Sequence, residues 1–152
     1  MGPELSMVPP VVDLPDAAVL NWGHHRTCFV HPHDPTKCIK VPLPGGTLDQ
    51  SLVEHDYYRH LAQRQVPLDH VAACHGWVDT SRGRGLVFDR IEYADGDDPS
   101  SVNLERAIST KLLGEREIRT GLRDLVAYLR EHRILWSDEN PKNICVTRRP
   151  RL

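Results

Sequence analysis

The sequence has 152 residues, enough for one globular domain with its own core, and is 39% hydrophobic and 26% charged. Its formal net charge of −2 excludes the overall basic footprint that binds nucleic acid or acidic lipid. No apolar run approaches the roughly 18 residues that span a bilayer, and the proline-broken start has no Lys or Arg, so we expect a cytoplasmic protein without a signal peptide or a membrane partner.

The first part of the chain predicts an extended arm followed by short strands. Residues 1–16 hold four prolines, which fix φ and donate no backbone hydrogen bond, and therefore favour an arm or an edge strand. Apolar or alternating segments separated by turn residues then predict strands at residues 17–22, 27–31 and 37–41.

A helix and a second pair of strands are expected next. Residues 48–65 predict a helix capped by Thr47 or Asp49. Its expected packing residues are Leu48, Leu52, Tyr57, Tyr58 and Leu61. Two further strands are predicted at residues 71–80 and 85–91, and the acidic segment 92–101 is the expected connector between two lobes.

Beyond the connector, the hydrophobic period changes to that of a helix. One apolar stripe predicts a helix over residues 115–132, with the members Ile118, Leu122, Leu125, Val126 and Leu129. A polar loop at 137–143 and a short strand at 144–147 follow. The order predicts an α+β fold, in which an antiparallel sheet with one helix (residues 17–91) precedes an incomplete helical lobe (residues 92–152).

Lys40 is the first candidate functional residue. In a strand, Ile39 and Val41 point to one face and Lys40 to the other, which is typical of a solvated lysine on a half-buried sheet. The functional interpretation is an ammonium that contacts phosphate oxygens and needs a carboxylate to position it. Glu54, fourteen positions later in the predicted helix, is the candidate carboxylate, although an exposed helix acid is the commoner role.

The second candidate is the loop that contains Asp138 and, five positions later, Asn143. An Asp and an Asn at this spacing can present two oxygens to one small volume, where the Asp orients a hydroxyl and the Asn binds Mg²⁺ beside a triphosphate. A capped polar turn after a helix is the alternative interpretation.

These features together resemble a known fold and a known family. The strand Lys, helix Glu, VFDRI segment, long helix and Asp-x4-Asn occur in the order of a protein-kinase-like fold. GHHRTCFVHPHDPTKCIKV, EHDYYRHL and NPKNI resemble more closely the YrbL family, the PhoP regulatory network proteins, over about residues 20–146. The resemblance implies a kinase-like fold in a bacterial cytoplasmic protein and does not by itself establish an activity.

The resemblance also implies roles for individual residues. Lys40 is similar to a phosphate-contacting lysine with Glu54 as its ion-pair partner, and Gly23 stands in the segment of the phosphate loop. The stretch that would meet an adenine is formed by Phe88, Asp89, Arg90 and Ile91. Asp138 resembles a catalytic aspartate and Asn143 a metal-binding asparagine, so Mg-ATP in the cleft between the lobes is the implied ligand. The acceptor, a protein or a small molecule, is not named by the sequence.

Several positions depart from the kinase pattern. The phosphate loop has Gly23 alone, followed by His24, His25 and Arg26, whose donors could substitute for bare backbone. Trp136 and Ser137 replace the usual His-Arg, and Asn140 stands where protein kinases have a lysine. No acidic residue follows Asn143, so the second metal-binding aspartate is missing. We therefore expect phosphoryl transfer to be weak or absent in this chain, as in a truncated or remnant kinase.

Two alternative functions remain open at this point. The same scaffold can serve as a non-catalytic regulatory or interaction protein. A zinc module is the other, because Cys28, His31, His33 and Cys38 supply N and S ligands and Cys74 follows, although no Cys-x2-Cys pair is present. The four cysteines otherwise favour reduced thiols, since a chain of this size can form its own core.

Overall fold

The computed structural model describes residues 9–93 and 102–147, which form two compact units. The sheet unit comprises the described residues up to Gln65 and those from Ala73 to Arg90, and the helical unit comprises Val66–Ala72 and the described residues from Ile91 onward. Residues 1–8 of the predicted arm and residues 94–101 of the predicted connector lie outside the described residues.

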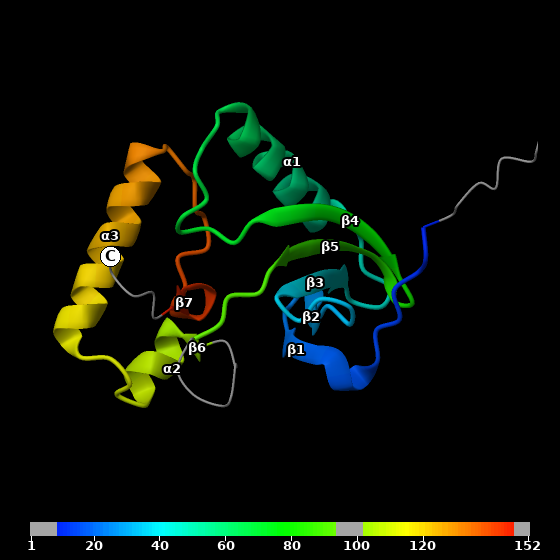
Figure 1. Cartoon of the computed structure of the whole chain (residues 1–152), viewed down its shortest axis with the longest axis horizontal. Helices are drawn as coiled ribbons and strands as arrows, with labels where there is room; N and C mark the ends of the chain where they lie inside the picture. The colour runs from blue at the N-terminus through cyan, green and yellow to red at the C-terminus, as the bar shows by residue number, and fades with distance from the viewer. Residues whose placement is uncertain (1–8, 94–101, 148–152) are drawn as a thin grey trace, which may run out of the picture. The chain divides into compact units, whose positions relative to one another are not determined.

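The sheet unit contains a five-stranded antiparallel sheet in the order β1-β2-β3-β5-β4, with one helix, α1, between β3 and β4 in the chain (Figure 1). The elements are η1 (Asp16–Ala18), β1 (Val19–Trp22), β2 (Arg26–Val30), β3 (Lys37–Pro42), α1 (Asp49–Gln63), β4 (Cys74–Thr80) and β5 (Gly83–Asp89). The α+β class, the antiparallel sheet and its single helix are therefore as predicted. The first predicted strand begins only at Val19, because a 3-10 turn precedes it.

Strand alternation divides the core of the sheet unit between the two faces of the sheet. One face carries the buried side chains of Phe29, Ile39 and Val41, on which Val12 and Leu14 of the N-terminal segment pack. The opposite face carries Cys38, Leu86 and Phe88, with Cys28, Tyr58, Cys74 and Trp77 packed against them. Lys40 belongs to this second face, because it alternates with Ile39 and Val41 along β3.

The described part of the N-terminal segment is held against the β4–β5 hairpin. Val12 forms a parallel bridge with Thr80, and its N–H donates to the carbonyl of Asp79 over 2.9 Å. Arg82 at the hairpin turn donates from Nε to the carbonyl of Leu14 over 2.6 Å. This segment therefore covers the Phe29–Ile39–Val41 face and leaves the face of Lys40 to α1.

Helix α1 turns a partly polar side toward the sheet. Its buried residues are Ser51 and Leu61, whereas Leu52, predicted to pack, is 47% exposed. The prediction for Leu52 was wrong because the helix faces the sheet with Ser51, Glu54, Tyr58 and Leu61. Two of these four residues are polar, so the apolar pattern alone did not reveal this face. The helix begins after Leu48 without a side-chain cap, so neither predicted capping residue serves as the N-cap.

The described part of the helical unit contains two α-helices and a short two-stranded sheet (Figure 1). Its elements are β6 (Val102–Asn103), α2 (Leu104–Ser109), α3 (Glu115–Glu131), η2 (Pro141–Asn143) and β7 (Cys145–Val146). Helix α3 agrees with the predicted helix over 115–132. The buried Tyr128 of α3 donates its hydroxyl to the carbonyl of Pro67 over 2.5 Å, which ties the segment 66–72 to this unit. The predicted stripe member Val126 is 42% exposed.

A two-stranded sheet pairs the residues just before α2 with the last described strand of the helical unit. Val102 pairs with Val146 and Asn103 with Cys145, and Leu104 N–H donates to the carbonyl of Ile144 over 2.8 Å. Asn103 also caps α2, because its side chain accepts from the N–H of Arg106. The polar loop 137–143 is thereby anchored at its C-terminal end beside α2.

Across the described residues, no helix is both long and apolar enough to cross a membrane.

Candidate functional site

The predicted pair of Lys40 and Glu54 forms in the sheet unit and gains a third member. Lys40 Nζ lies 3.2 Å from Glu54 Oε1, and Arg26 Nη1 lies 2.5 Å from Glu54 Oε2. Arg26 also donates to the hydroxyl of Ser51 over 3.3 Å. Cys28 of β2 pairs with Lys40 of β3, so the two side chains share one face of the sheet. Arg26 lies two residues before Cys28 in β2 and therefore lies on the same face. Two cations therefore share one carboxylate, and the cluster has one positive charge in excess.

Burial makes this cluster more than a surface ion pair. The side chains of Arg26, Glu54 and Lys40 are 14%, 25% and 32% exposed, so each is shielded from water but still reachable by a ligand. Partial burial strengthens the attraction between the charges relative to an exposed pair, whose value is about 0–1 kcal/mol. Arg26 was not predicted to join this pair, although strand alternation from Cys28 places Arg26 on the face of Lys40.

Phe88 completes the environment of Lys40. The ammonium of Lys40 lies 4.3 Å from the centroid of the Phe88 ring, a distance at which a cation is attracted to an aromatic face. The ring of Tyr58 from α1 packs edge-on against Phe88 with the centroids 5.7 Å apart. Lys40 is thus fixed from two sides, by a carboxylate on α1 and by an aromatic ring on β5.

The structure gives Gly23 and Asp89 local roles. Gly23 N–H donates to the carbonyl of Arg26 over 2.8 Å, and a Cβ at Gly23 would lie 2.8 Å from that same oxygen, so the tight β1–β2 turn requires glycine. The N–H groups of Asp89 and Arg90 donate to the carbonyls of Ala73 and Thr36. Both donors at the end of β5 are therefore used within the protein.

The carboxylate of Asp89 holds three segments of the sheet unit together. It accepts from Lys37 Nζ over 3.2 Å and from the N–H of Ala73 over 3.3 Å, and it contacts His75 Nε2 at 2.7 Å. Burial would raise the pKa of Asp89, but the hydrogen bonds from His75 and Lys37 outweigh it and lower the pKa.

Asp89→Asn is expected to destabilise the protein by about 1 kcal/mol at pH 7, because the site is partly solvated and the lost charge-assisted bonds are screened. A carboxyl whose pKa is lower in the folded state stabilises that state above the pKa of the unfolded chain, which is about 4. This stabilisation is lost as the pH falls through the folded pKa. The difference between wild type and variant, measured by urea unfolding, should therefore shrink below about pH 4.

Asp79→Asn is the matched control, since Asp79 is an exposed carboxylate on the neighbouring strand β4. We expect it to change the unfolding free energy by less than about 0.5 kcal/mol. Equal losses of unfolding free energy for the two variants would contradict the role of the Asp89 carboxylate in holding the three segments together.

Two thiols lie beside Lys40 on the same face of the sheet. A hydrogen bond with the Cys38 thiol lowers the pKa of Cys28, burial opposes this shift, and the charges of Lys40 and Arg26 add to the lowering. The same bond and burial raise the pKa of Cys38. The cysteines of the described part of the chain are free thiols.

The zinc interpretation finds no support in the geometry. In residues 9–93 and 102–147, no three side chains of His, Cys, Asp or Glu gather as a metal-binding group. Cys28 and Cys38 face α1, whereas His31 and His33 lie at the β2–β3 turn, where their ring centroids are 5.9 Å apart. A four-ligand tetrahedral site needs all of its donors in one place.

Asp138 and Asn143 come together within the helical unit. Asn143 Nδ2 donates to Asp138 Oδ2 over 2.7 Å, and Asn140 accepts from the N–H of Lys142 over 3.0 Å to close the intervening turn. The amide oxygen of Asn143 and the second carboxylate oxygen of Asp138 remain as cation ligands or acceptors. Ile91 lies in the helical unit, whereas Lys40 lies in the sheet unit. That Ile91 and Lys40 bind the same ligand stays a prediction.

Comparisons with known proteins identify relatives of the chain. Residues 12–151 match the family model described as PhoP regulatory network protein YrbL. The chain is 31% identical over 137 residues to the uncharacterized protein YrbL of Escherichia coli K12, and equally to that of Shigella flexneri. The alignment covers 88% of this chain and 65% of each relative, so the chain spans just under two thirds of their length. No solved structure matches the chain.

Proposed function

The chain belongs to the YrbL family of PhoP regulatory network proteins, and from this premise we propose that its sheet unit binds an adenine nucleotide and holds the phosphates with Lys40. A phosphate chain needs fixed cations that stay charged and remain accessible. The observation that carries the proposal is the ammonium of Lys40, which Glu54 holds at 3.2 Å while 32% of the side chain stays exposed.

The fold of the sheet unit supports the proposal. The five-stranded antiparallel sheet with one helix between β3 and β4 agrees with the antiparallel sheet and single helix that the resemblance implies for a kinase-like small lobe. Lys40 lies on β3 and Glu54 lies on α1, so their ion pair links the strand to the helix. Phe88 limits the depth of the site, because its buried ring lies under the ammonium of Lys40.

The base of the nucleotide is proposed to lie near the end of β5. Phe88 would set the size of the adenine site, and the backbone from Asp89 to Ile91 would meet the edge of the base. Because the N–H groups of Asp89 and Arg90 already donate to carbonyl oxygens, we expect neither to bind the base.

The polar loop of the helical unit would supply any chemistry beyond binding. Asp138 would orient the hydroxyl of an acceptor, and Asn143 would contribute one oxygen to Mg²⁺. The hydrogen bond between these side chains fixes the asparagine with its nitrogen toward Asp138 and leaves its oxygen for a cation. Nucleotide binding itself requires neither residue, so it can be tested without assuming a reaction.

Titration with Mg-ATP by isothermal calorimetry tests the proposal. We expect wild type to bind and Lys40→Ala to lose affinity by about tenfold or more, or about 1.4 kcal/mol, because a charge-assisted contact to phosphate disappears. Lys111→Ala, which removes the same charge at an exposed position of the helical unit, should bind as wild type does.

Two results would overturn the assignment. One is the absence of heat with wild type over the millimolar range, which would favour the non-catalytic interaction protein. The other is equal affinity of wild type and Lys40→Ala, with far-ultraviolet circular dichroism confirming that both are folded.

A further inference from the structure

Two cysteine thiols lie close together on the face of the sheet that carries Lys40. Cys28 of β2 pairs with Lys40 of β3, and Cys38 lies two residues before Lys40 on the same strand, so both thiols point to one face. Both pack in the cluster of Leu86 and Phe88. A hydrogen bond joins the two thiols. They therefore form a dithiol that spans two neighbouring strands.

The two thiols differ in exposure and in their electrostatic surroundings. Cys28 is half-buried, whereas Cys38 is 7% exposed. The hydrogen bond from Cys38 and the charges of Lys40 and Arg26 lower the pKa of Cys28 against the effect of burial. The same hydrogen bond and burial raise the pKa of Cys38. Cys28 is therefore the better nucleophile of the pair, and Cys38 stays protonated beside it.

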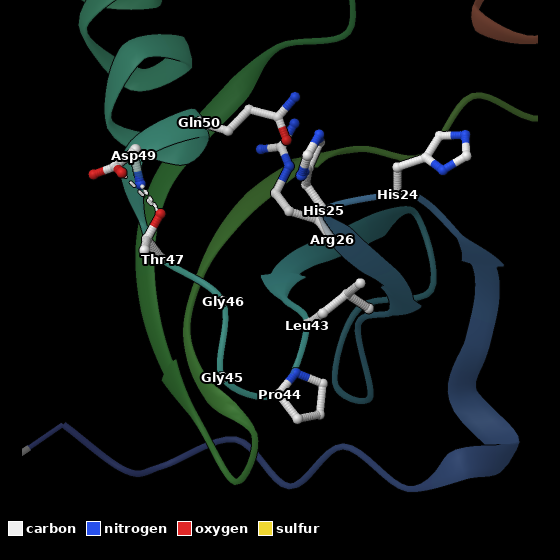
Figure 2. Close-up of a pocket in the computed structure, with 10 residues that line it drawn as sticks. All are labelled: His24, His25, Arg26, Leu43, Pro44, Gly45, Gly46, Thr47, Asp49 and Gln50. Carbon is white, nitrogen blue, oxygen red and sulfur yellow. Dashed lines mark hydrogen bonds between the residues drawn. The ribbon is translucent and has the colours of Figure 1, made fainter.

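The Arg26 side of the dithiol is open to small solutes. Arg26 lines a hollow of about 590 Å³ between the β1–β2 turn and the loop that joins β3 to α1 (Figure 2). Figure 2 shows the end of the Arg26 side chain beside those of His25 and Gln50. Cys28 does not line the hollow itself, but it lies two residues after Arg26 on the same face of β2.

We propose that Cys28 and Cys38 are a site of reversible oxidation by a hydroperoxide, which joins them in a disulfide. The Cys28 thiolate attacks one peroxide oxygen, the O–O bond breaks, and the other oxygen takes up a proton and leaves as water or an alcohol. The sulfur is thereby oxidised to a sulfenic acid and the peroxide is reduced. The Cys38 sulfur then attacks the Cys28 sulfur, the S–O bond breaks, and the hydroxyl leaves with the Cys38 proton as water. This inference does not depend on nucleotide binding.

Closing the disulfide requires a small movement of the two strands. Diagonal neighbours on one face of an antiparallel pair have Cα atoms about 7–8 Å apart, whereas a disulfide spans at most about 7 Å. Strands β2 and β3 must therefore approach each other slightly at this position. A disulfide that holds its strands out of their relaxed positions is easier to reduce than a relaxed one, so we expect a dithiol reductant to reverse the oxidation.

Peptide mapping after treatment with hydrogen peroxide at neutral pH tests the proposal. Trypsin places the four cysteines in separate peptides, residues 27–37, 38–40, 65–82 and 143–148. After alkylation and digestion without reductant, we expect 27–37 joined to 38–40, with a mass lower by two hydrogen atoms than the sum of the two peptides. Dithiothreitol should separate them. Cys145 is the exposed internal control, and Cys28 should be oxidised at least about tenfold faster.

Three variants assign the steps. In Cys38→Ser the sulfenic acid of Cys28 has no thiol to attack it, so dimedone should label peptide 27–37. In Cys28→Ser the buried Cys38 should not be labelled. Cys145→Ser is the matched control and should form the same disulfide as wild type.

Any of three results would overturn the proposal. They are the absence of the link between 27–37 and 38–40 in wild type, a link from either peptide to 65–82 in its place, and oxidation of Cys145 as fast as that of Cys28. The wild-type map decides the question even if a serine variant proves unfolded by circular dichroism.

Discussion

Replacing Glu54 with glutamine will destabilise the protein by about 2 kcal/mol at neutral pH, because the change removes the anion that Arg26 and Lys40 share. The two cations would then face each other with only a neutral amide between them. The cost is smaller than for a fully buried pair, since Glu54 is 25% exposed. Urea unfolding followed by circular dichroism measures the loss.

A matched control separates this effect from the loss of any helix carboxylate. Asp56 lies on the same helix with its side chain 72% exposed and contacts Arg59 one turn away. Asp56→Asn makes the same carboxylate-to-amide change and should cost less than about 0.5 kcal/mol. Equal costs for the two variants would show that Glu54 is no more than a surface acid.

A double variant tests the physical cause. In the Glu54→Gln background, Arg26→Leu removes one of the two repelling cations and should restore part of the lost stability. In wild type, the same Arg26→Leu substitution should destabilise, because it breaks the 2.5 Å contact to Glu54. If the two substitutions are additive, the charges of Arg26 and Glu54 do not interact.

Local patterns in the sequence predicted most of the elements. The alternation of Cys38, Ile39, Lys40 and Val41 was enough to place β3 and to separate its two faces, since a strand has a period of two. The apolar stripe of α3 predicted that helix to within one residue at its C-terminal end, because a period of 3.6 was maintained over its length. These signals are contained within single segments.

Pairings between distant segments were not predictable in this way. Strand β6 has two residues and exists because Val102 and Asn103 meet β7, more than forty positions away. Segment 66–72 was assigned to the small lobe by position, yet it belongs to the helical unit, where Pro67 accepts the hydroxyl of Tyr128. Neither short segment carries a periodicity of its own.

The candidate site was predicted in part. Lys40 and Glu54 were paired from their residue types and from the resemblance, and their contact at 3.2 Å agrees with that prediction. Arg26 was missed because an arginine beside a turn is commonly solvent-exposed, and only the strand register brings it to Glu54. The polar side of α1 that faces the sheet was not predicted either. Ser51 is buried as a hydrogen-bond partner of Arg26 and does not belong to an apolar stripe.

The last prediction concerns Gly85, whose replacement by alanine should destabilise the sheet unit by about 2–3 kcal/mol. A Cβ at this position would lie 2.7 Å from Ile39 Cγ2 and 3.1 Å from both the carbonyl oxygen of Lys40 and Cγ2 of Val41. Ile39 is fully buried, so it cannot move aside without disturbing the core. Strand β3, which carries Lys40, would have to shift away from β5.

Gly121→Ala is the control with the opposite sign. Gly121 lies in α3, and a Cβ added there would meet nothing within 4 Å, so alanine adds helix propensity without a clash and should stabilise by about 0.5–1 kcal/mol. Urea unfolding of both variants, with crystallographic or NMR comparison of β3, provides the measurement. If Gly85→Ala left the free energy of unfolding unchanged, Ile39 and β3 would relax at little cost. Lys40 would then be held less rigidly than its contacts with Glu54 and Phe88 require.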